Sequence, residues 1–238
     1  ISSSTEKGDD RIITGPGMDY VDGQAGNDKV TVNLMGDSSV NYANVVDTGA
    51  DTDVNTLVVE GTENDDNLLV RRSKEENSLG FVALLPTGGV NQNSSNANTN
   101  IERVNFTEAI SVVNLNANGG DDLVSLDGSA KSMNIDGGAG KDTFQIGQLY
   151  KSERETTNSA QVLANDAYNT VKTNEEEYLG EGVTKDTVVN IEGGSDVDTF
   201  IVNHNEGRLN LNGGKGDDNF AVFSYQDEND KPITNGPM

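Results

Sequence analysis

The stretch Gly137-Gly138-Ala139-Gly140-Lys141-Asp142-Thr143-Phe144-Gln145 decides the fold of this chain. It fits the nine-residue pattern G-G-x-G-x-D-x-U-x, in which U is a large apolar residue, at every defined position. The glycines allow left-handed backbone conformations that turn the carbonyls toward one point, and Asp142 brings a carboxylate to that point. Phe144 is expected to point inward, because side chains alternate along a strand. The stretch therefore predicts a ligand-bearing turn followed by a short strand.

Other parts of the chain repeat this pattern. Residues 213–221 fit it just as fully, and residues 193–201 depart from it only at Asp196, which replaces the fourth-position glycine. Weaker copies of the pattern lie at residues 14–22, 23–31, 50–58, 61–69 and around the turn at 117–122. A chain that repeats in this way is expected to have a repeating fold.

The most regular parts of the chain have a period of twenty residues. The apolar positions Val113, Leu115, Val124 and Leu126 return twenty residues later as Met133, Ile135, Phe144 and Ile146. A second pair of coils does the same, with Val189, Ile191, Phe200 and Val202 followed by Leu209, Leu211, Phe220 and Val222. Twenty residues make one coil of two short strands and two turns. The sequence therefore predicts an all-β fold, a parallel β-solenoid (β-roll or β-helix) with inward ladders of apolar residues.

The spacing of the repeats also suggests how the chain is divided. We expect one continuous solenoid made of a lead-in (1–13), N-terminal repeats (14–70), interrupted and loop-rich coils (71–112), regular coils (113–146), a surface insertion (147–188), further regular coils (189–224) and a tail (225–238).

The composition is poor for an ordinary globular core. Only 33% of the residues are hydrophobic, and 40 acidic residues face 16 Lys and Arg, which gives a net charge of -24. Such a chain stays disordered in water until its charge is neutralised. Carboxylates and carbonyls are hard oxygen ligands, so a divalent cation is the expected partner, and its binding would couple to folding.

Composition also narrows the class of protein. The acidity argues against nucleic acid as a partner, since no basic stripe exists to hold phosphates. No apolar run approaches the roughly 20 residues of a membrane span, and the absence of cysteine excludes a redox role. The opening Ile1-Ser2-Ser3-Ser4 is not a signal peptide, and we expect a fragment of a longer, exported chain.

The glycine-rich turns resemble the RTX, or haemolysin-type, calcium-binding repeats of bacterial secreted proteins. The mixture of twenty-residue coils and long insertions looks more like the repetitive regions of very large extracellular proteins, such as adhesins and surface-layer proteins, than the compact tandem arrays of RTX toxins and proteases. The resemblance implies β-roll or β-helix folding, several bound Ca²⁺ ions, and a chain that folds after export and acts outside the cell or at its surface.

The resemblance also implies which residues hold calcium. The ligands would be the sixth-position carboxylates and the glycine carbonyls of stacked turns, with Asp122 and Asp142 at one site and Asp198 and Asp218 at another. The implied ligands are Asp19, Asp28, Asp66, Asp122, Asp142, Asp198, Asp218, Gly137, Gly140, Gly193, Gly213 and Gly216, with Asn55, Asp53, Asp65, Asp121, Asp196 and Asp217 as secondary candidates.

Three other features of the sequence could indicate catalysis or ligand binding instead. Acidic pairs such as Asp121-Asp122 resemble the two carboxylates of a glycosidase or the acidic calcium site of a β-helical lyase, but they recur with the structural period, whereas a catalytic pair is normally unique. The only histidine, His204, is expected to be an exposed turn residue without an orienting partner. Arg71-Arg72 could bind a carboxylate or a sugar acid, but we expect this pair to be solvated.

These observations favour a calcium-dependent structural or adhesive module without enzymatic activity. The alternative is the folding and secretion module of a secreted enzyme or toxin whose active domain lies elsewhere. The expected partners are calcium, neighbouring modules or copies of the same protein in an array or filament, and a cell-surface or matrix ligand.

Overall fold

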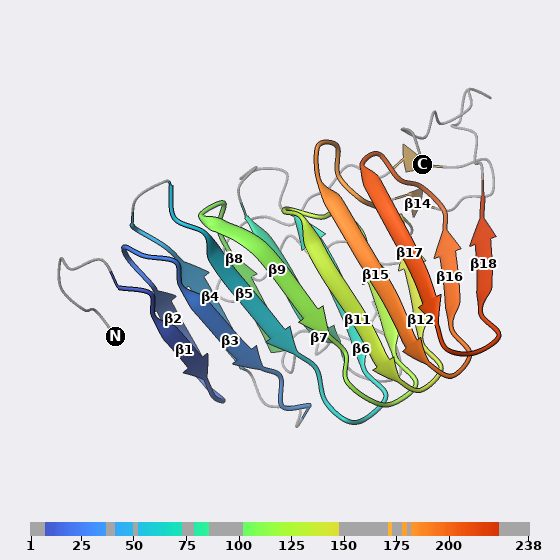
Figure 1. Ribbon diagram of the computed structural model, residues 1–238, viewed down its shortest axis with the longest axis horizontal. Helices are drawn as coiled ribbons and strands as arrows, with labels where there is room; N and C mark the ends of the chain where they lie inside the picture. The colour runs from blue at the N-terminus through green and yellow to red at the C-terminus, as the bar shows by residue number, and fades with distance from the viewer. Residues whose placement is uncertain are drawn as a thin grey trace.

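The computed structural model describes residues 8–36, 41–49, 52–72, 79–85, 102–147, 171–172, 178–179 and 182–223. This part of the chain is all β, with eighteen strands and no helix (Figure 1). The prediction of an all-β fold is therefore confirmed. No helix in these residues is long and apolar enough to cross a bilayer.

Seven strands form the first sheet, called sheet A, and all of its neighbouring strands are parallel. In sheet order the strands are β1 (Arg11–Thr14), β3 (Lys29–Asn33), β5 (Asn55–Glu60), β9 (Ile110–Asn116), β11 (Met133–Ala139), β15 (Val188–Ser195) and β17 (Arg208–Gly214).

Nine strands form the second sheet, called sheet B. In sheet order they are β18 (Asn219–Val222), β16 (Thr199–Val202), β12 (Thr143–Ile146), β10 (Leu123–Leu126), β6 (Asn67–Arg72), β7 (Gly80–Leu85), β8 (Glu102–Phe106), β4 (Tyr42–Val46) and β2 (Met18–Asp22). Neighbours are parallel except at β7, which is antiparallel to both β6 and β8. The short strands β13 (Val171–Lys172) and β14 (Tyr178–Leu179) form a separate antiparallel pair.

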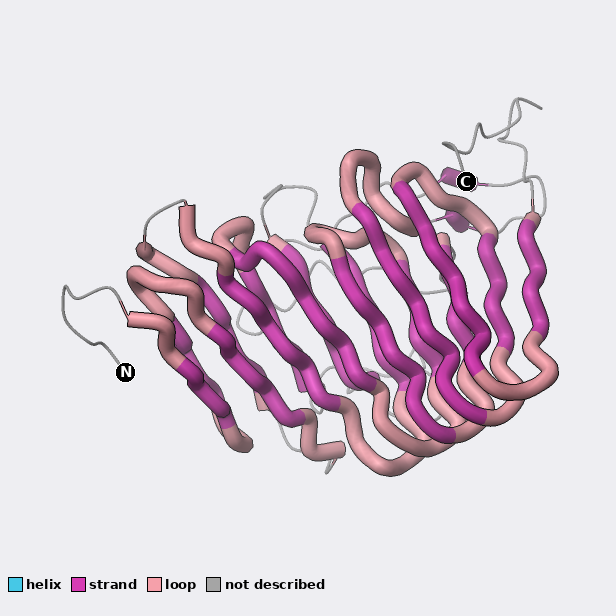
Figure 2. The backbone as a smooth tube through the Cα atoms, viewed as in Figure 1, coloured by secondary structure: helices cyan, strands magenta, loops and turns pink. Residues whose placement is uncertain are grey.

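Apart from β6, β7 and β8, which follow one another within sheet B, the chain alternates between the two sheets, so that successive strands lie on opposite sides of the core (Figures 1 and 2). The register has the twenty-residue spacing that the sequence predicts, since Met133 pairs with Val113 and Phe144 with Val124. Across the long interruption after Gly147 the same register continues, with Phe144 paired to Phe200. The coils on either side of that interruption are therefore direct neighbours.

Identical inward positions stack into ladders between the sheets. The ring centroids of Phe144 and Phe200 lie 4.9 Å apart, and those of Phe200 and Phe220 lie 4.6 Å apart, with the rings nearly parallel. These distances follow from the roughly 4.8 Å spacing of neighbouring strands. Phe144 and Phe200 are fully buried, so the ladder is part of the main apolar core.

The segment predicted to be loop-rich, 71–112, contains the end of β6, the whole of β7 and β8, and the start of β9. The apolar run from Phe81 to Leu85 lies in β7, where Val82 joins the main core while Phe81 and Ala83 form a second cluster with Leu69. The Asn- and Ser-rich residues 91–100 and most of the predicted insertion at 147–188 lie outside the described residues.

Candidate functional site

Five sixth-position aspartates form a row at the turns that lead into sheet B, here called the aspartate row. They come together because β6, β10, β12, β16 and β18 are neighbours in the sheet. The backbone N–H of each of the first four donates to Oδ1 of the next carboxylate, from Asp66 to Asp122 (2.7 Å), Asp122 to Asp142 (2.9 Å), Asp142 to Asp198 (2.9 Å) and Asp198 to Asp218 (3.0 Å). Hydrogen bonds to an ionised acceptor are stronger than neutral ones, so the row ties adjacent coils together.

The second carboxylate oxygen of three residues in the row is buried without a hydrogen bond in the described structure. These are the Oδ2 atoms of Asp122, Asp142 and Asp198. A buried acceptor without a partner is costly, and a charged one more so. The oxygens therefore need a proton or a cation close to them.

Burial shifts the acidity of these groups. Desolvation raises the pKa of Asp122 to about 7 and that of Asp142 to about 6, and the charges of neighbouring aspartates add to the rise. The backbone N–H that each carboxylate accepts acts in the opposite direction. The pKa of Asp198 is raised for the same first reason, burial.

The first-position glycines leave the space that these carboxylates fill. A Cβ atom on Gly137 would overlap Oδ2 of Asp142 and would lie 2.5 Å from the carbonyl oxygen of Gly193. A Cβ atom on Gly193 would likewise overlap Oδ2 of Asp198 and would lie 2.5 Å from the carbonyl oxygen of Gly213. In both of these turns the first glycine is thus faced by a carboxylate oxygen of its own turn and by a carbonyl oxygen of the next coil.

The fourth-position glycines are needed for a different reason, the close stacking of turns. Gly140 and Gly216 have φ values of 125° and 133°, which L side chains rarely adopt. A Cβ atom on either would also overlap the backbone of the preceding coil, at Gly120 or at Asp196. Asp196 itself stands at a fourth position with a φ of 76°, so this copy keeps a left-handed conformation without glycine.

The fifth-position residues form a second, more exposed line of bonds. The N–H of Asp121 donates to Oδ1 of Asp65 at 2.8 Å, and the N–H of Lys141 donates to Oδ1 of Asp121 at 2.9 Å. These bonds run back toward the preceding coil, opposite in sense to those of the aspartate row. Asp217 and Asp196 are exposed, and the hydroxyl of Ser195 contacts Asp196 at 3.3 Å.

The N-terminal coils carry a separate acidic group at the turns that lead into sheet A. The N–H of Asp10 donates to Oδ1 of Asp28 at 2.7 Å, and the N–H of Asp28 donates to Oδ1 of Asn55 at 2.9 Å. The Oδ2 atom of Asp28 is buried without a hydrogen bond in the described structure. The side-chain amide of Asn55 also donates to the carboxylate of Asp47. Burial raises the pKa of both Asp28 and Asp47.

Three further acidic residues lie in the N-terminal coils. Asp53 accepts the N–H of Gly26 at 2.9 Å, which places it in the same group as Asp28. The sequence analysis did not single out Asp47, and the only signal for it was an aspartate near the end of both strands, with Asp22 the last residue of β2 and Asp47 directly after β4. The structure places Asp19 within β2, paired with Ala43, so it belongs to neither acidic group.

Two expectations about other side chains are wrong. His204, expected to be exposed, is only 6% exposed, because the turn that carries it packs under Gly147 and Gly182. Arg71, expected to be solvated, is buried, and its Nε lies 2.7 Å from Oδ2 of Asp127. Asp127 directly follows β10, the strand that neighbours β6 in sheet B, and lies 56 residues from Arg71 in the sequence.

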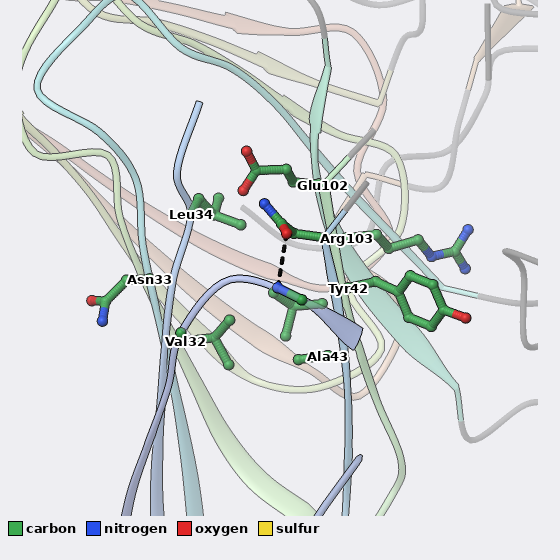
Figure 3. Close-up of a pocket in the computed structure, with 11 residues that line it drawn as sticks. Val32, Asn33, Leu34, Tyr42, Ala43, Glu102 and Arg103 are labelled. Carbon is green, nitrogen blue, oxygen red and sulfur yellow. Dashed lines mark hydrogen bonds between the residues drawn. The ribbon is translucent and has the colours of Figure 1, made fainter. Parts of the chain in front are cut away.

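A pocket lies beside the end of β3 and the starts of β4 and β8 (Figure 3). Val32, Leu34 and Ala43 supply apolar walls, and Glu102 also lines the pocket. Both carboxylate oxygens of Glu102 accept backbone N–H groups at 2.7 Å, from Met35 and Gly36. Glu102 therefore ties β8 to the segment after β3, which is a structural role.

In the part of the chain that the structure describes, no three acidic or histidine side chains converge on a point where they could hold a metal ion. A cation at the aspartate row would thus need carbonyl oxygens as well as carboxylates. Comparison of the chain with protein-family models, with curated proteins and with solved structures finds no match in any of the three. The resemblance to haemolysin-type repeats rests on the repeat residues alone.

Proposed function

We propose that this chain is a calcium-stabilised parallel β-solenoid that acts as a structural or adhesive module of an exported bacterial protein. The observation that supports it best is the aspartate row, in which buried Oδ2 atoms of consecutive coils lie without hydrogen bonds. The alternation of the chain between two mostly parallel sheets, in twenty-residue register, supports the solenoid part of the proposal.

The oxygens at the row suit a calcium ion in their chemistry. Calcium takes six to eight oxygen ligands from carboxylates, carbonyls and water, in flexible geometry. The residues that would hold it are Asp122, Asp142, Asp198 and Asp218, with the carbonyl groups of Gly193 and Gly213. A bound divalent cation would offset both the burial of these negative charges and their mutual repulsion.

The charge of the whole chain supports the same conclusion. Stacking the coils brings carboxylates together in a protein with 40 acidic and 16 basic residues. Ions that bind only the folded state stabilise it by mass action. Millimolar calcium outside the cell would therefore favour the stacked coils, while a low-calcium compartment would leave the chain less stable.

The test is far-UV circular dichroism of the chelated protein during a calcium titration, with magnesium as the control ion. We expect calcium to increase the β signal cooperatively and to raise the midpoint of urea unfolding, with magnesium much less effective because it demands a near-ideal octahedral site.

Matched variants assign the effect to the aspartate row. Replacing both carboxylates in the variant Asp122→Asn/Asp142→Asn keeps the side-chain size and the Oδ1 acceptors, and we expect it to lose most of the calcium response. Asp217→Asn removes an exposed charge outside the row and should keep the response. A wild-type spectrum and unfolding midpoint unaffected by calcium after chelation would refute the proposal.

A further inference from the structure

Among the residues that the structure describes, the last coil leaves apolar ladder residues exposed on its C-terminal side. Phe220 is 53% exposed and Val222 is 52% exposed, whereas Phe200 and Val202, one strand earlier in the same ladder, are 0% and 6% exposed. The ring of Phe220 is stacked on that of Phe200 on one face only. The open ladder is thus a surface of the kind that an adjacent coil covers elsewhere in the molecule.

Within the described residues, no strand pairs with the backbone of the last coil on the same side. β17 and β18 are the outermost strands of sheets A and B. The N–H groups of Asn219 and Phe223 donate to carbonyls of the preceding coil, at 2.8 and 2.9 Å. Because these groups alternate in direction along a strand, the N–H groups of Phe220 and Val222 point away from β16. Such an edge is a template for another strand.

The last coil carries little net charge, so two copies of its surface would repel each other only weakly. Residues 203–223 contain three acidic and two basic residues, a net charge of -1, in a chain whose total is -24. The opposite end of the fold is less suitable, because residues 8–22 carry four acidic residues and one basic residue. Asp19 lies two residues before Val21 in β2, on the same face of the strand. In a head-to-tail contact between two copies, Asp19 would therefore meet the apolar residues of β18.

We infer that the C-terminal face of the last coil, formed by β17 and β18, binds the same face of a second copy of this chain through a two-fold axis. β18 then lies antiparallel to β18 of the other copy. Centring the pair on Ala221 places Phe220 of one copy opposite Val222 of the other, and these are the residues whose N–H and C=O groups point outward. The same patch meets itself, as a two-fold contact requires. This inference concerns assembly and does not depend on which cation binds the turns.

Sedimentation velocity over a concentration series tests the pairing, with and without calcium. We expect wild type to convert from monomer to dimer as its concentration rises, and to stop at dimer. Phe220→Asp would bury an unpaired charge in the contact and should weaken dimerisation by about 100-fold or more. Val222→Pro removes an outward N–H for which the described residues show no hydrogen bond, and should weaken dimerisation as well. Val54→Asp changes a residue that is 57% exposed in another coil and should leave it unchanged.

Circular dichroism of the same samples separates loss of pairing from loss of folding, so a folded, monomeric Phe220→Asp protein supports the inference. A wild-type protein that is folded yet monomeric at the highest concentration would overturn it. So would a dimer that Phe220→Asp and Val54→Asp affect equally, or oligomers that keep lengthening, because open-ended growth indicates a head-to-tail contact.

Discussion

The backbone N–H of Asp142 donates to Oδ1 of Asp198 at 2.9 Å, although 56 residues separate the two in the sequence. The same bond joins Asp122 to Asp142 and Asp198 to Asp218, where the separation is only 20 residues. The turn geometry is thus the same whether or not a long segment leaves the coil in between. Stacking of coils, rather than distance along the chain, determines which carboxylates meet.

The first-position glycines should be intolerant of a side chain. We expect Gly137→Ala to lower the free energy of unfolding by about 1–3 kcal/mol or more, because its Cβ atom would overlap Asp142 and crowd Gly193. Gly15→Ala is the control, since a Cβ atom there meets nothing within 4 Å. That variant should change stability by less than about 1 kcal/mol. Urea unfolding measures both, and equal effects would contradict this account of the turn.

The metal-free protein should lose stability as the pH rises. The pKa of Asp122 is raised by burial from 3.8 to about 7 in the folded state, and that of Asp142 to about 6. Between pH 4 and 7 the folded chain therefore binds more protons than the unfolded chain, so unfolding becomes easier with increasing pH. We expect the urea midpoint in the presence of chelator to be higher at pH 5 than at pH 7.5.

The Asp122→Asn/Asp142→Asn variant is the control for this pH dependence, because it removes the two titrating groups while keeping their size. Its midpoint should change much less over the same range. A wild-type midpoint that rises between pH 5 and 7.5 would show that these carboxylates are not the dominant groups.

The middle of the phenylalanine ladder should matter more than its end. Phe200 is fully buried between Phe144 and Phe220, so Phe200→Ala should cost about 3–5 kcal/mol of stability. Phe220→Ala removes a half-exposed ring and should cost only about 1–2 kcal/mol. Both are measured by urea unfolding at a protein concentration low enough to keep the chain monomeric. A larger loss for Phe220→Ala would argue against the end position of its coil.

The ion pair between Arg71 and Asp127 should be sensitive to the loss of either partner. Both side chains are almost fully buried, so Arg71→Met, which leaves a buried carboxylate, should cost about 3–5 kcal/mol. The double variant Arg71→Met/Asp127→Leu should recover part of that loss, because no uncompensated charge then remains. A double-mutant cycle by urea unfolding checks this coupling, and additive losses would contradict it.

The sequence predicted the regular half of the fold for a definite physical reason. A strict twenty-residue period leaves only one register in which Val124, Phe144 and the other apolar positions stay inside, and that register also brings the aspartates together. The period carries no information on the antiparallel strand β7, because Phe81 to Leu85 contains no turn motif. It is equally silent on Arg71, whose partner lies on another coil, and on Asp47, which lies outside the repeated pattern.

The unequal number of strands in the two sheets has a consequence for the shape of longer assemblies. β7 and β8 lie between β4 and β6 in sheet B, while β3 and β5 remain direct neighbours in sheet A. At the usual strand spacing, two additional strands make sheet B about 10 Å longer than sheet A. The β7–β8 hairpin therefore lengthens only one of the two sheets, and we expect the coils before and after it to differ in direction. A long tether built from such segments would therefore bend at each hairpin of this kind.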